Sequence, residues 1–173
     1  GIPGSMGGAV TMNAGAYDGE IQNVVTAVTA VDADGNVIRY DREMLDFGYR
    51  HSIFQDNGQV ICEVELSLKK GDAASIRERM GTLTEKRESR QPLEMPSAGS
   101  TFKRPQGYFA GTLIENTELK GFRVGGAQIS TKHAGFVVNA GNATAADVLH
   151  LIEEGQEKVY EESMNNIYTY IGN

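Results

Sequence analysis

One short segment contains a hydroxyl group and cations that could act together on an anionic substrate. Residues 97–105 place Ser100 after two small residues, and Lys103 and Arg104 follow it closely. Such a loop could present the serine hydroxyl into a cleft while the two cations hold an anionic ligand. The local sequence by itself favours a plainer role, a turn hydrogen bond. An acylating serine is not predicted, because the G-x-S-x-G pattern is absent.

A second segment surrounds Arg50 with aromatic and aliphatic residues, and Tyr49 and His51 flank it directly. An arginine in such surroundings is partly desolvated and usually pairs with a carboxylate or a phosphate, since its planar guanidinium group suits either. The local pattern favours a structural salt bridge over a substrate contact. Both interpretations remain open at this level.

A third segment, residues 4–17, is rich in glycine and alanine. Small side chains let backbone amides approach an anion such as a diphosphate, and a short helix near 6–12 would add partial positive charge. A tight turn packed on a sheet explains the composition equally well. The G-x-G-x-x-G dinucleotide pattern is absent. Because the chain opens inside this segment without an initiator methionine, we expect a fragment of a longer protein.

The composition argues against several classes of protein. The 173 residues carry a net charge of −7 and no basic run longer than two residues, so no nucleic-acid partner is expected. No apolar run approaches ~18 residues, and no signal peptide is visible, so no membrane association is expected. The single cysteine, Cys62, fits a cytoplasmic location. The three histidines form no metal-binding pattern, and His51 and His150 are expected at the surface.

Periodicity predicts a β-rich first part and a mixed second part, with a domain boundary near residue 70. Residues 24–31 and 37–40 read as a hairpin, 45–54 as a loop, and 60–68 as a half-buried strand whose even positions face the core. Asp72 caps a helix with Ile76, Met80, Leu83 and Arg87 on one face, and a linker follows at 91–96. The remaining expected elements are a strand or loop at 98–104, helices at 107–119 and 144–162, and strands at 124–130, 135–139 and 167–171.

Four segments together resemble one family. They are GIPGSMGGA (1–9) with MNAGAY (12–17), YRHS (49–52), AGSTFKRP (98–105) and STKHAGFVVN (130–139). In this order they resemble the C-terminal part of UDP-N-acetylenolpyruvoylglucosamine reductase, the MurB family. The short spacing between Arg50 and the Ser100 segment resembles the compact subtype that lacks an extra tyrosine-bearing loop.

The resemblance implies a fold and a reaction. The fold would be α+β, with residues 1–70 as the second half of a FAD-binding α+β domain and residues 71–173 as a smaller α/β domain that binds a UDP-sugar. NADPH would reduce FAD, and the flavin would pass hydride to UDP-N-acetylglucosamine enolpyruvate, giving the peptidoglycan precursor UDP-N-acetylmuramate. The oligomeric state is not implied.

The resemblance also implies roles for single residues. Arg50 would stabilise charge on the enolpyruvyl carboxylate, and Ser100 would be the proton donor. The substrate would also contact Tyr49, Lys103 and Arg104. The cofactor-binding residues would be Gly4, Ser5, Gly7, Gly8, Asn13, Gly15 and Ala16.

Two departures from the family pattern keep other functions open. Ile167 occupies the place of a further catalytic glutamate, and the first flavin-binding glycine loop has no counterpart in these residues. The chain could therefore be a UDP-sugar-binding fragment without flavin or catalysis. Another FAD oxidoreductase with a different substrate is a third possibility, against which the Ser100 segment argues.

Overall fold

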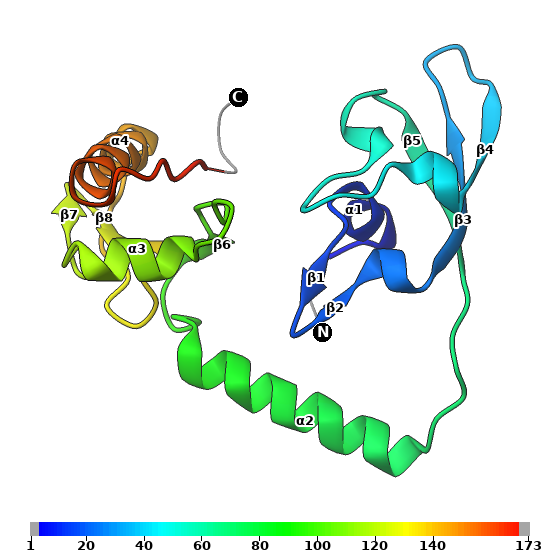
Figure 1. The fold of residues 1–173 in the computed structure, drawn as a ribbon, viewed down its shortest axis with the longest axis horizontal. Helices are drawn as coiled ribbons and strands as arrows, with labels where there is room; N and C mark the ends of the chain where they lie inside the picture. Colours follow the sequence, from blue (N-terminus) through cyan, green and yellow to red (C-terminus); the bar gives the residue numbers. More distant parts are fainter. Residues whose placement is uncertain (1–3, 170–173) are drawn as a thin grey trace. The chain divides into compact units, whose positions relative to one another are not determined.

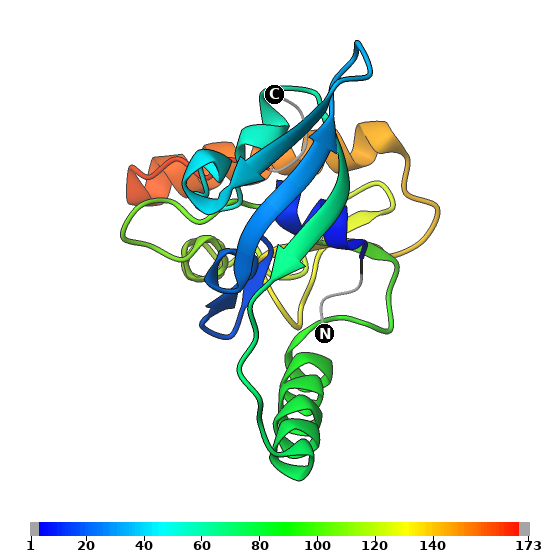
Figure 2. The ribbon, with the colours of Figure 1, turned by 90° about the vertical axis from the view of Figure 1, so that its right-hand side faces the viewer.

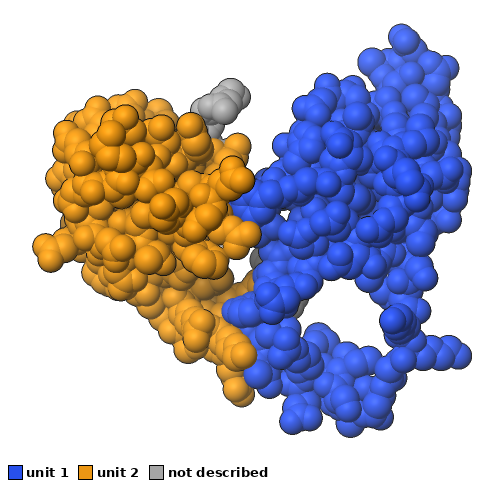
Figure 3. Space-filling view, in the orientation of Figure 1, with its two compact units in different colours: residues 1–83 blue, residues 84–173 orange. Residues whose placement is uncertain are grey.

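The computed structural model describes residues 4–169, and the chain divides into two compact units between residues 83 and 84 (Figure 3). Helix α2 (Ala73–Arg90) crosses this division, and the boundary expected near residue 70 precedes the helix. Both units combine helices with antiparallel strands, so the described chain is α+β (Figure 1). Within residues 4–169, no helix has the length and apolar character needed to cross a membrane.

Unit 1 is built on an antiparallel sheet of three strands in the order β4-β3-β5. These are β3 (Val25–Val31), β4 (Val37–Asp41) and β5 (Val60–Leu66). Helix α1 (Met6–Thr11) contacts β5 and lies behind the sheet in Figure 2. The predicted hairpin and the short helix near 6–12 are confirmed. Apolar side chains from the sheet, α1 and the following loops form one core, which contains Val10, Val25, Val28, Ala30, Leu45 and Phe54.

Short elements around this sheet shape the loops of unit 1. A two-residue hairpin, β1 (Gly15–Ala16) with β2 (Gly19–Glu20), follows α1 directly. Three 3₁₀ helices connect the longer elements, namely η1 (Ile21–Asn23), η2 (Arg42–Leu45) and η3 (Ile53–Gln55). The loop predicted at 45–54 therefore lies between η2 and η3.

Strand β5 exists as predicted, but its predicted buried face is confirmed only in part. The apolar side chains of β5 that pack on the core are Ile61 and Val64, of which only Val64 has an even number, whereas Val60 and Leu66 are exposed. The cause is an irregularity in pairing with β3, where Ile61 opposes Ala30 but Glu63 opposes the adjacent Thr29. One extra residue in β5 reverses the alternation of its side chains between the two faces.

Helix α2 confirms the predicted cap but buries none of its residues. The Asp72 carboxylate accepts hydrogen bonds from the Ser75 backbone N–H at 2.9 Å and from its hydroxyl at 3.0 Å. These bonds satisfy a donor of the first helical turn. The apolar side chains Ile76 and Met80 remain about half exposed, so the amphipathic pattern of α2 does not correspond to a buried face.

Unit 2 contains a four-stranded sheet in the order β6-β9-β8-β7, and every pair in it is antiparallel. The strands are β6 (Ser97–Ser100), β7 (Arg123–Val124), β8 (Ala127–Ile129) and β9 (Phe136–Asn139). This unit is therefore α+β, and the expected α/β arrangement is wrong. Successive strands β7, β8 and β9 are joined by connections too short for the crossover that parallel pairing requires.

Two helices of unit 2, α3 (Ala110–Asn116) and α4 (Ala145–Ser163), contact each other and share one core with the sheet. The stripe predicted for the second helix is confirmed, since Leu151, Ile152 and Val159 are buried. Thr144 and Asp147 form a capping box at its start.

Three predicted elements of unit 2 have different bounds in the structure. The strand expected at 124–130 is the β7–β8 hairpin, because Gly125 has φ +53° and a Cβ on Gly126 would collide with the Gly141 carbonyl oxygen. The helix expected at 107–119 is the shorter α3. Of the strand expected at 167–171, Thr169 pairs with Phe102, and residues 170–171 lie outside the described residues.

Candidate functional site

Arg50 of unit 1 occupies a tight turn in an unusual backbone conformation. The backbone N–H of Gly48 donates to the His51 carbonyl at 3.1 Å, and the His51 N–H donates back to the Gly48 carbonyl at 3.3 Å. Between these residues Arg50 has φ +55°, a left-handed conformation that is costly for a side chain with a Cβ. The turn therefore exists only because surrounding contacts hold it.

Asn13 is one of the residues that hold this turn. Its side chain is fully buried, and its Nδ2 donates to the Gly48 carbonyl at 2.8 Å and to Glu20 at 3.1 Å. Its Oδ1 accepts from the Gln22 backbone N–H at 3.2 Å. Asn13 thus joins the glycine-rich segment to the Arg50 turn, and its amide is engaged within unit 1.

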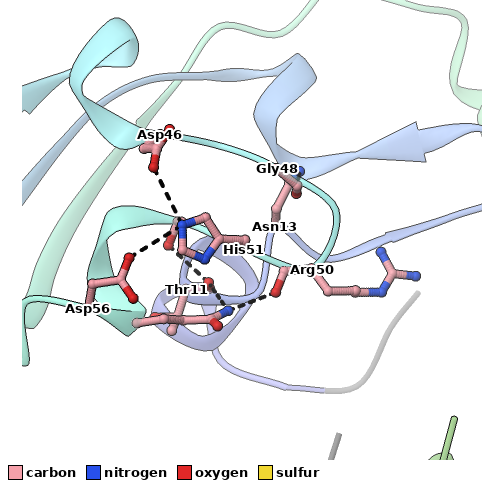
Figure 4. A network of polar contacts seen from close by, with 9 residues as sticks. Thr11, Asn13, Asp46, Gly48, Arg50, His51 and Asp56 are labelled. Carbon is pink, nitrogen blue, oxygen red and sulfur yellow. Dashed lines mark hydrogen bonds and ion pairs between the residues drawn. The ribbon is translucent and has the colours of Figure 1, made fainter. Parts of the chain in front are cut away.

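His51 lies on the other side of the same turn, between two carboxylates (Figure 4). Its Nε2 is 3.5 Å from Asp46 Oδ2 and 3.4 Å from Asp56 Oδ2. The imidazole is 34% exposed and lies beside two exposed carboxylates, so His51 is a partly exposed surface residue, and His150 is exposed as expected. The two carboxylates orient the ring and thereby support the loop between η2 and η3.

The Arg50 side chain extends away from His51 (Figure 4). Its Nη2 donates to the Gly15 carbonyl at 2.8 Å, and its Cζ lies 5.2 Å from the centre of the Tyr49 ring. No carboxylate among residues 4–169 forms an ion pair with it. The structural salt bridge favoured by the local sequence is therefore not formed within the described chain.

Left-handed backbone conformations gather around this turn. Of the residues other than glycine with positive φ, five lie in two segments that contact each other. Such conformations cluster where a loop must present a group in a fixed direction. The five residues are Asn13, Tyr17, Asp18, Asp46 and Arg50.

The remaining candidate residues of the glycine-rich segment lie around the start of α1 and in the β1–β2 hairpin. Ser5 is the N-cap of α1, and its hydroxyl accepts from the Gly8 N–H at 3.1 Å. Gly4 and Gly8 are exposed, and Gly7 packs near Ile61 of β5. In the hairpin, Gly15 is half-buried and pairs with Glu20, and Ala16 is exposed. The segment presents small side chains beside the Arg50 turn.

In unit 2, Ser100 lies at the end of β6, next to an irregularity in the strand. Ser100 pairs with Phe136 and Ser97 with Val138, so the intervening residues interrupt the ladder, and Gly99 has φ +93°. Ser100 is exposed, and its hydroxyl forms no hydrogen bond with another residue of the described chain. The turn hydrogen bond favoured by the local sequence is thus made by Ser97, whose Oγ accepts from the Gly99 N–H at 3.2 Å.

His133 supports the strand that pairs with Ser100, a role that sequence reasoning missed. Its Nδ1 accepts from the Gly135 N–H at 3.1 Å, so a neutral ring carries its proton on Nε2. The ring packs edge-to-face on Phe136 with 4.9 Å between ring centres. The Gly135 carbonyl in turn accepts from the Thr101 N–H at 2.9 Å. His133 therefore connects to the residue that follows Ser100.

The two basic residues after Ser100 make different contacts, one through its backbone and one through its guanidinium group. The Lys103 N–H donates to the Tyr168 carbonyl at 2.6 Å, which ties the segment to the C-terminal part of unit 2. The Arg104 Cζ lies 5.2 Å from the centre of the Phe109 ring, and Phe109 is 65% exposed. Neighbouring Tyr108 is also exposed. Sequence reasoning did not select these aromatics, although an exposed aromatic beside an arginine is a recurrent ligand contact.

Comparisons with known proteins agree with these features. Residues 91–168 match the family model "UDP-N-acetylenolpyruvoylglucosamine reductase, C-terminal domain". Proteins with that name from Clostridium perfringens (strain SM101) and Clostridium botulinum (strain Langeland) are each 52% identical to this chain over 171 residues. Each alignment covers 99% of this chain and 56% of the relative. The chain is therefore similar to the C-terminal part of UDP-N-acetylenolpyruvoylglucosamine reductases.

A solved structure of such a reductase is similar to this chain. The crystal structure of the reductase (MurB) from Thermus caldophilus is 43% identical, with a TM-score of 0.81 over 91% of this chain and 57% of that protein. The chain thus spans a little over half the length of the MurB relatives it matches, and it corresponds to their C-terminal part. The resemblance inferred from the four sequence segments is confirmed.

Ile167 is a core residue of unit 2. The resemblance places a catalytic glutamate at its position, yet its side chain is only 1% exposed and packs in the core with α3 and α4. The Gln156 side chain donates to its carbonyl at 2.7 Å. Ile167 carries no titratable group, so it can take no part in proton transfer.

A pH-dependent stability follows from His133 of unit 2. Burial lowers the pKa of His133 below its ordinary value of 6.5, and Lys120 acts in the same direction. As pH falls through 6.5, the unfolded histidine binds its proton first, so the native state loses stability. Above pH 6.5 His133 is neutral in both the folded and the unfolded protein, so its contribution to stability does not change further with pH.

The expected result is a steeper loss of thermal stability between about pH 7 and pH 5 in the wild type than in His133→Asn. Asparagine can accept the Gly135 N–H bond but does not titrate in this range. Thermal denaturation at several pH values measures both curves. Parallel curves would show that His133 does not contribute to the pH dependence.

Proposed function

We propose that the protein carrying this chain reduces UDP-N-acetylglucosamine enolpyruvate to UDP-N-acetylmuramate, with NADPH as reductant and FAD as cofactor. The 52% identity to named UDP-N-acetylenolpyruvoylglucosamine reductases supports this reaction. The single observation that carries the proposal for this chain concerns Ser100. Its hydroxyl is exposed and makes no hydrogen bond to another residue within 4–169. The proposal includes the expected cytoplasmic location and the peptidoglycan precursor as product.

The two units would then have different tasks. Residues 1–70 would form part of the FAD-binding domain, and residues 71–173 would bind the UDP-sugar. Reduced flavin would supply hydride to C3 of the enolpyruvyl group. Small side chains at Gly4, Ser5, Gly7, Gly8, Gly15 and Ala16 fit this assignment, because they allow close approach of a diphosphate to the backbone. Asn13 would act indirectly, since its amide is engaged inside unit 1.

Arg50 and Ser100 would complete the reduction of the substrate. Addition of hydride to C3 places negative charge on the enolpyruvyl carboxylate, and the Arg50 guanidinium would stabilise that charge. Ser100 would then donate its hydroxyl proton to C2, which yields the saturated lactyl ether. A serine hydroxyl is a weak acid, so the basic carbon and a nearby cation such as Lys103 would assist the transfer. Tyr49, Lys103 and Arg104 would contact the substrate.

The test is an NADPH oxidation assay on the protein that carries this chain, with and without the enolpyruvyl sugar nucleotide. Mass spectrometry should identify UDP-N-acetylmuramate in amounts that match the NADPH consumed when substrate is present. Oxidation of NADPH without formation of this product would show that the protein is another kind of flavin oxidoreductase.

A second candidate function is UDP-sugar binding without flavin chemistry. The observation that favours it is the buried apolar Ile167 at the position where the resemblance places a catalytic glutamate. A visible absorption spectrum of the purified protein separates the two candidates. A flavin band supports the reductase, whereas its absence combined with calorimetric binding of UDP-N-acetylglucosamine supports the binding module.

A further inference from the structure

The Gln55 side chain forms a bridge between Arg50 and α1. Its Nε2 donates to the Arg50 carbonyl at 2.8 Å and to the Thr11 carbonyl at 3.0 Å. Both partners are carbonyl oxygens, which only accept, so the orientation of the amide is determined. A primary amide carries two N–H groups, and Gln55 uses both of them here.

This bridge acts on the backbone of the one candidate catalytic residue that has a left-handed conformation. Arg50 has φ +55°, and a return to negative φ would rotate its Cβ and swing the whole side chain. Asn13 holds the Gly48 end of the same turn at 2.8 Å, while Gln55 holds the Arg50 carbonyl itself. The guanidinium group is held separately, at the Gly15 carbonyl.

We propose that Gln55 is a positioning residue that acts through Arg50. This inference rests on the proposed function, in which the Arg50 guanidinium stabilises charge on the substrate. By fixing the Arg50 carbonyl against the end of α1, Gln55 keeps the strained turn in place and aims the guanidinium before substrate arrives. Such preorganisation favours the transition state more than the bound ground state.

Gln55 can be substituted without removing the core of unit 1. Its side chain is exposed, whereas Asn13 and Ser52 are fully buried. The Ser52 hydroxyl also donates to the Thr11 carbonyl, at 2.9 Å, so α1 remains attached to the loop when Gln55 is changed. Substitutions of Gln55 therefore report on the Arg50 turn.

The test compares Gln55→Glu with Gln55→Lys. The glutamate has the same shape but turns two acceptor oxygens toward two carbonyls, whereas the lysine ammonium can donate to both. Because small displacements of a catalytic group cost up to about a hundredfold, we expect Gln55→Glu to lower kcat for the enolpyruvyl substrate about ten- to a hundredfold. The KM should change less than kcat, reduction of FAD by NADPH should be unchanged, and Gln55→Lys should recover most of the rate.

The control is Gln91→Glu, which makes the same chemical change in unit 2. The side-chain amide of Gln91 makes no hydrogen bond among residues 4–169, so this variant should keep the wild-type rate. Amide hydrogen exchange at His51, whose N–H closes the turn, gives a readout that does not depend on activity. It should accelerate in Gln55→Glu and stay slow in Gln55→Lys. A wild-type rate in Gln55→Glu, or failure of the lysine to restore it, would overturn the inference. If the wild type forms no UDP-N-acetylmuramate, the proposed function fails. If hydrogen exchange at His51 is the same in Gln55→Glu as in the wild type, the positioning role fails, whatever the activity.

Discussion

Replacement of Ser100 by alanine should slow reduction of the enolpyruvyl sugar nucleotide by about 10²–10⁴, while reduction of the flavin by NADPH stays unchanged. A positioned general acid contributes a factor of this size, and only the second half-reaction needs the proton. The structure supports a role in proton donation, because Ser100 is exposed at the end of β6 and Ser97 makes the local turn bond instead. Rapid-mixing absorbance measurements of the two half-reactions separate these effects.

Ser100→Thr is the matched control for this prediction. Threonine keeps a hydroxyl group and suits a strand position, so it should retain much more activity than alanine. Because Ser100 is exposed and its hydroxyl makes no bond within residues 4–169, thermal stability should hardly change in either variant. Equal loss of both half-reactions in Ser100→Ala would show that this serine has a structural role.

Replacement of Arg50 by methionine should lower the same substrate half-reaction by about 10²–10³, the usual effect of removing one group that stabilises developing negative charge. Methionine has a similar length but no charge and no N–H donor. The methionine variant also lacks the hydrogen bond from Arg50 to the Gly15 carbonyl. The half-reactions and the KM for the enolpyruvyl substrate are the quantities to measure.

Arg50→Lys separates charge from geometry at this position. Both variants have a Cβ and bear the same backbone strain at φ +55°, so a difference between them reflects the side-chain head group. Lysine keeps the positive charge but not the planar fork, and its rate should lie between those of methionine and arginine. If both variants matched the wild type, Arg50 would have no role in charge stabilisation.

Short-range patterns predicted much of the fold because their causes lie within a few residues. The stripe of α4 follows from helical periodicity and is buried as expected, and its capping residues lie beside it in sequence. The hairpin of β3 and β4 follows from alternation around a turn. Predicted boundaries were wrong where a contact with a residue distant in sequence determined them. An example is the β7–β8 hairpin, where Gly126 packs on Gly141.

The burial of β5 shows the limit of alternation. Its even positions read as the core face, but one extra residue opposite β3 changes which side chains point inward. An irregularity of this kind depends on how two strands align over a long sequence separation. The residues of β5 alone therefore do not predict this irregularity.

The sequence by itself determined the resemblance to UDP-N-acetylenolpyruvoylglucosamine reductases, the mixed α+β composition and the segments that contain Arg50 and Ser100, because these depend on residue order and local spacing. Only the tertiary structure decided which contacts those segments make. It gave Arg50 a carbonyl partner instead of a carboxylate, left the Ser100 hydroxyl exposed, and buried Ile167 in the core. It also brought Gln55 to Thr11, 44 residues away. Contacts between residues so far apart in sequence form only when the chain folds and its polar groups must find hydrogen-bond partners. A short stretch of sequence therefore does not reveal them.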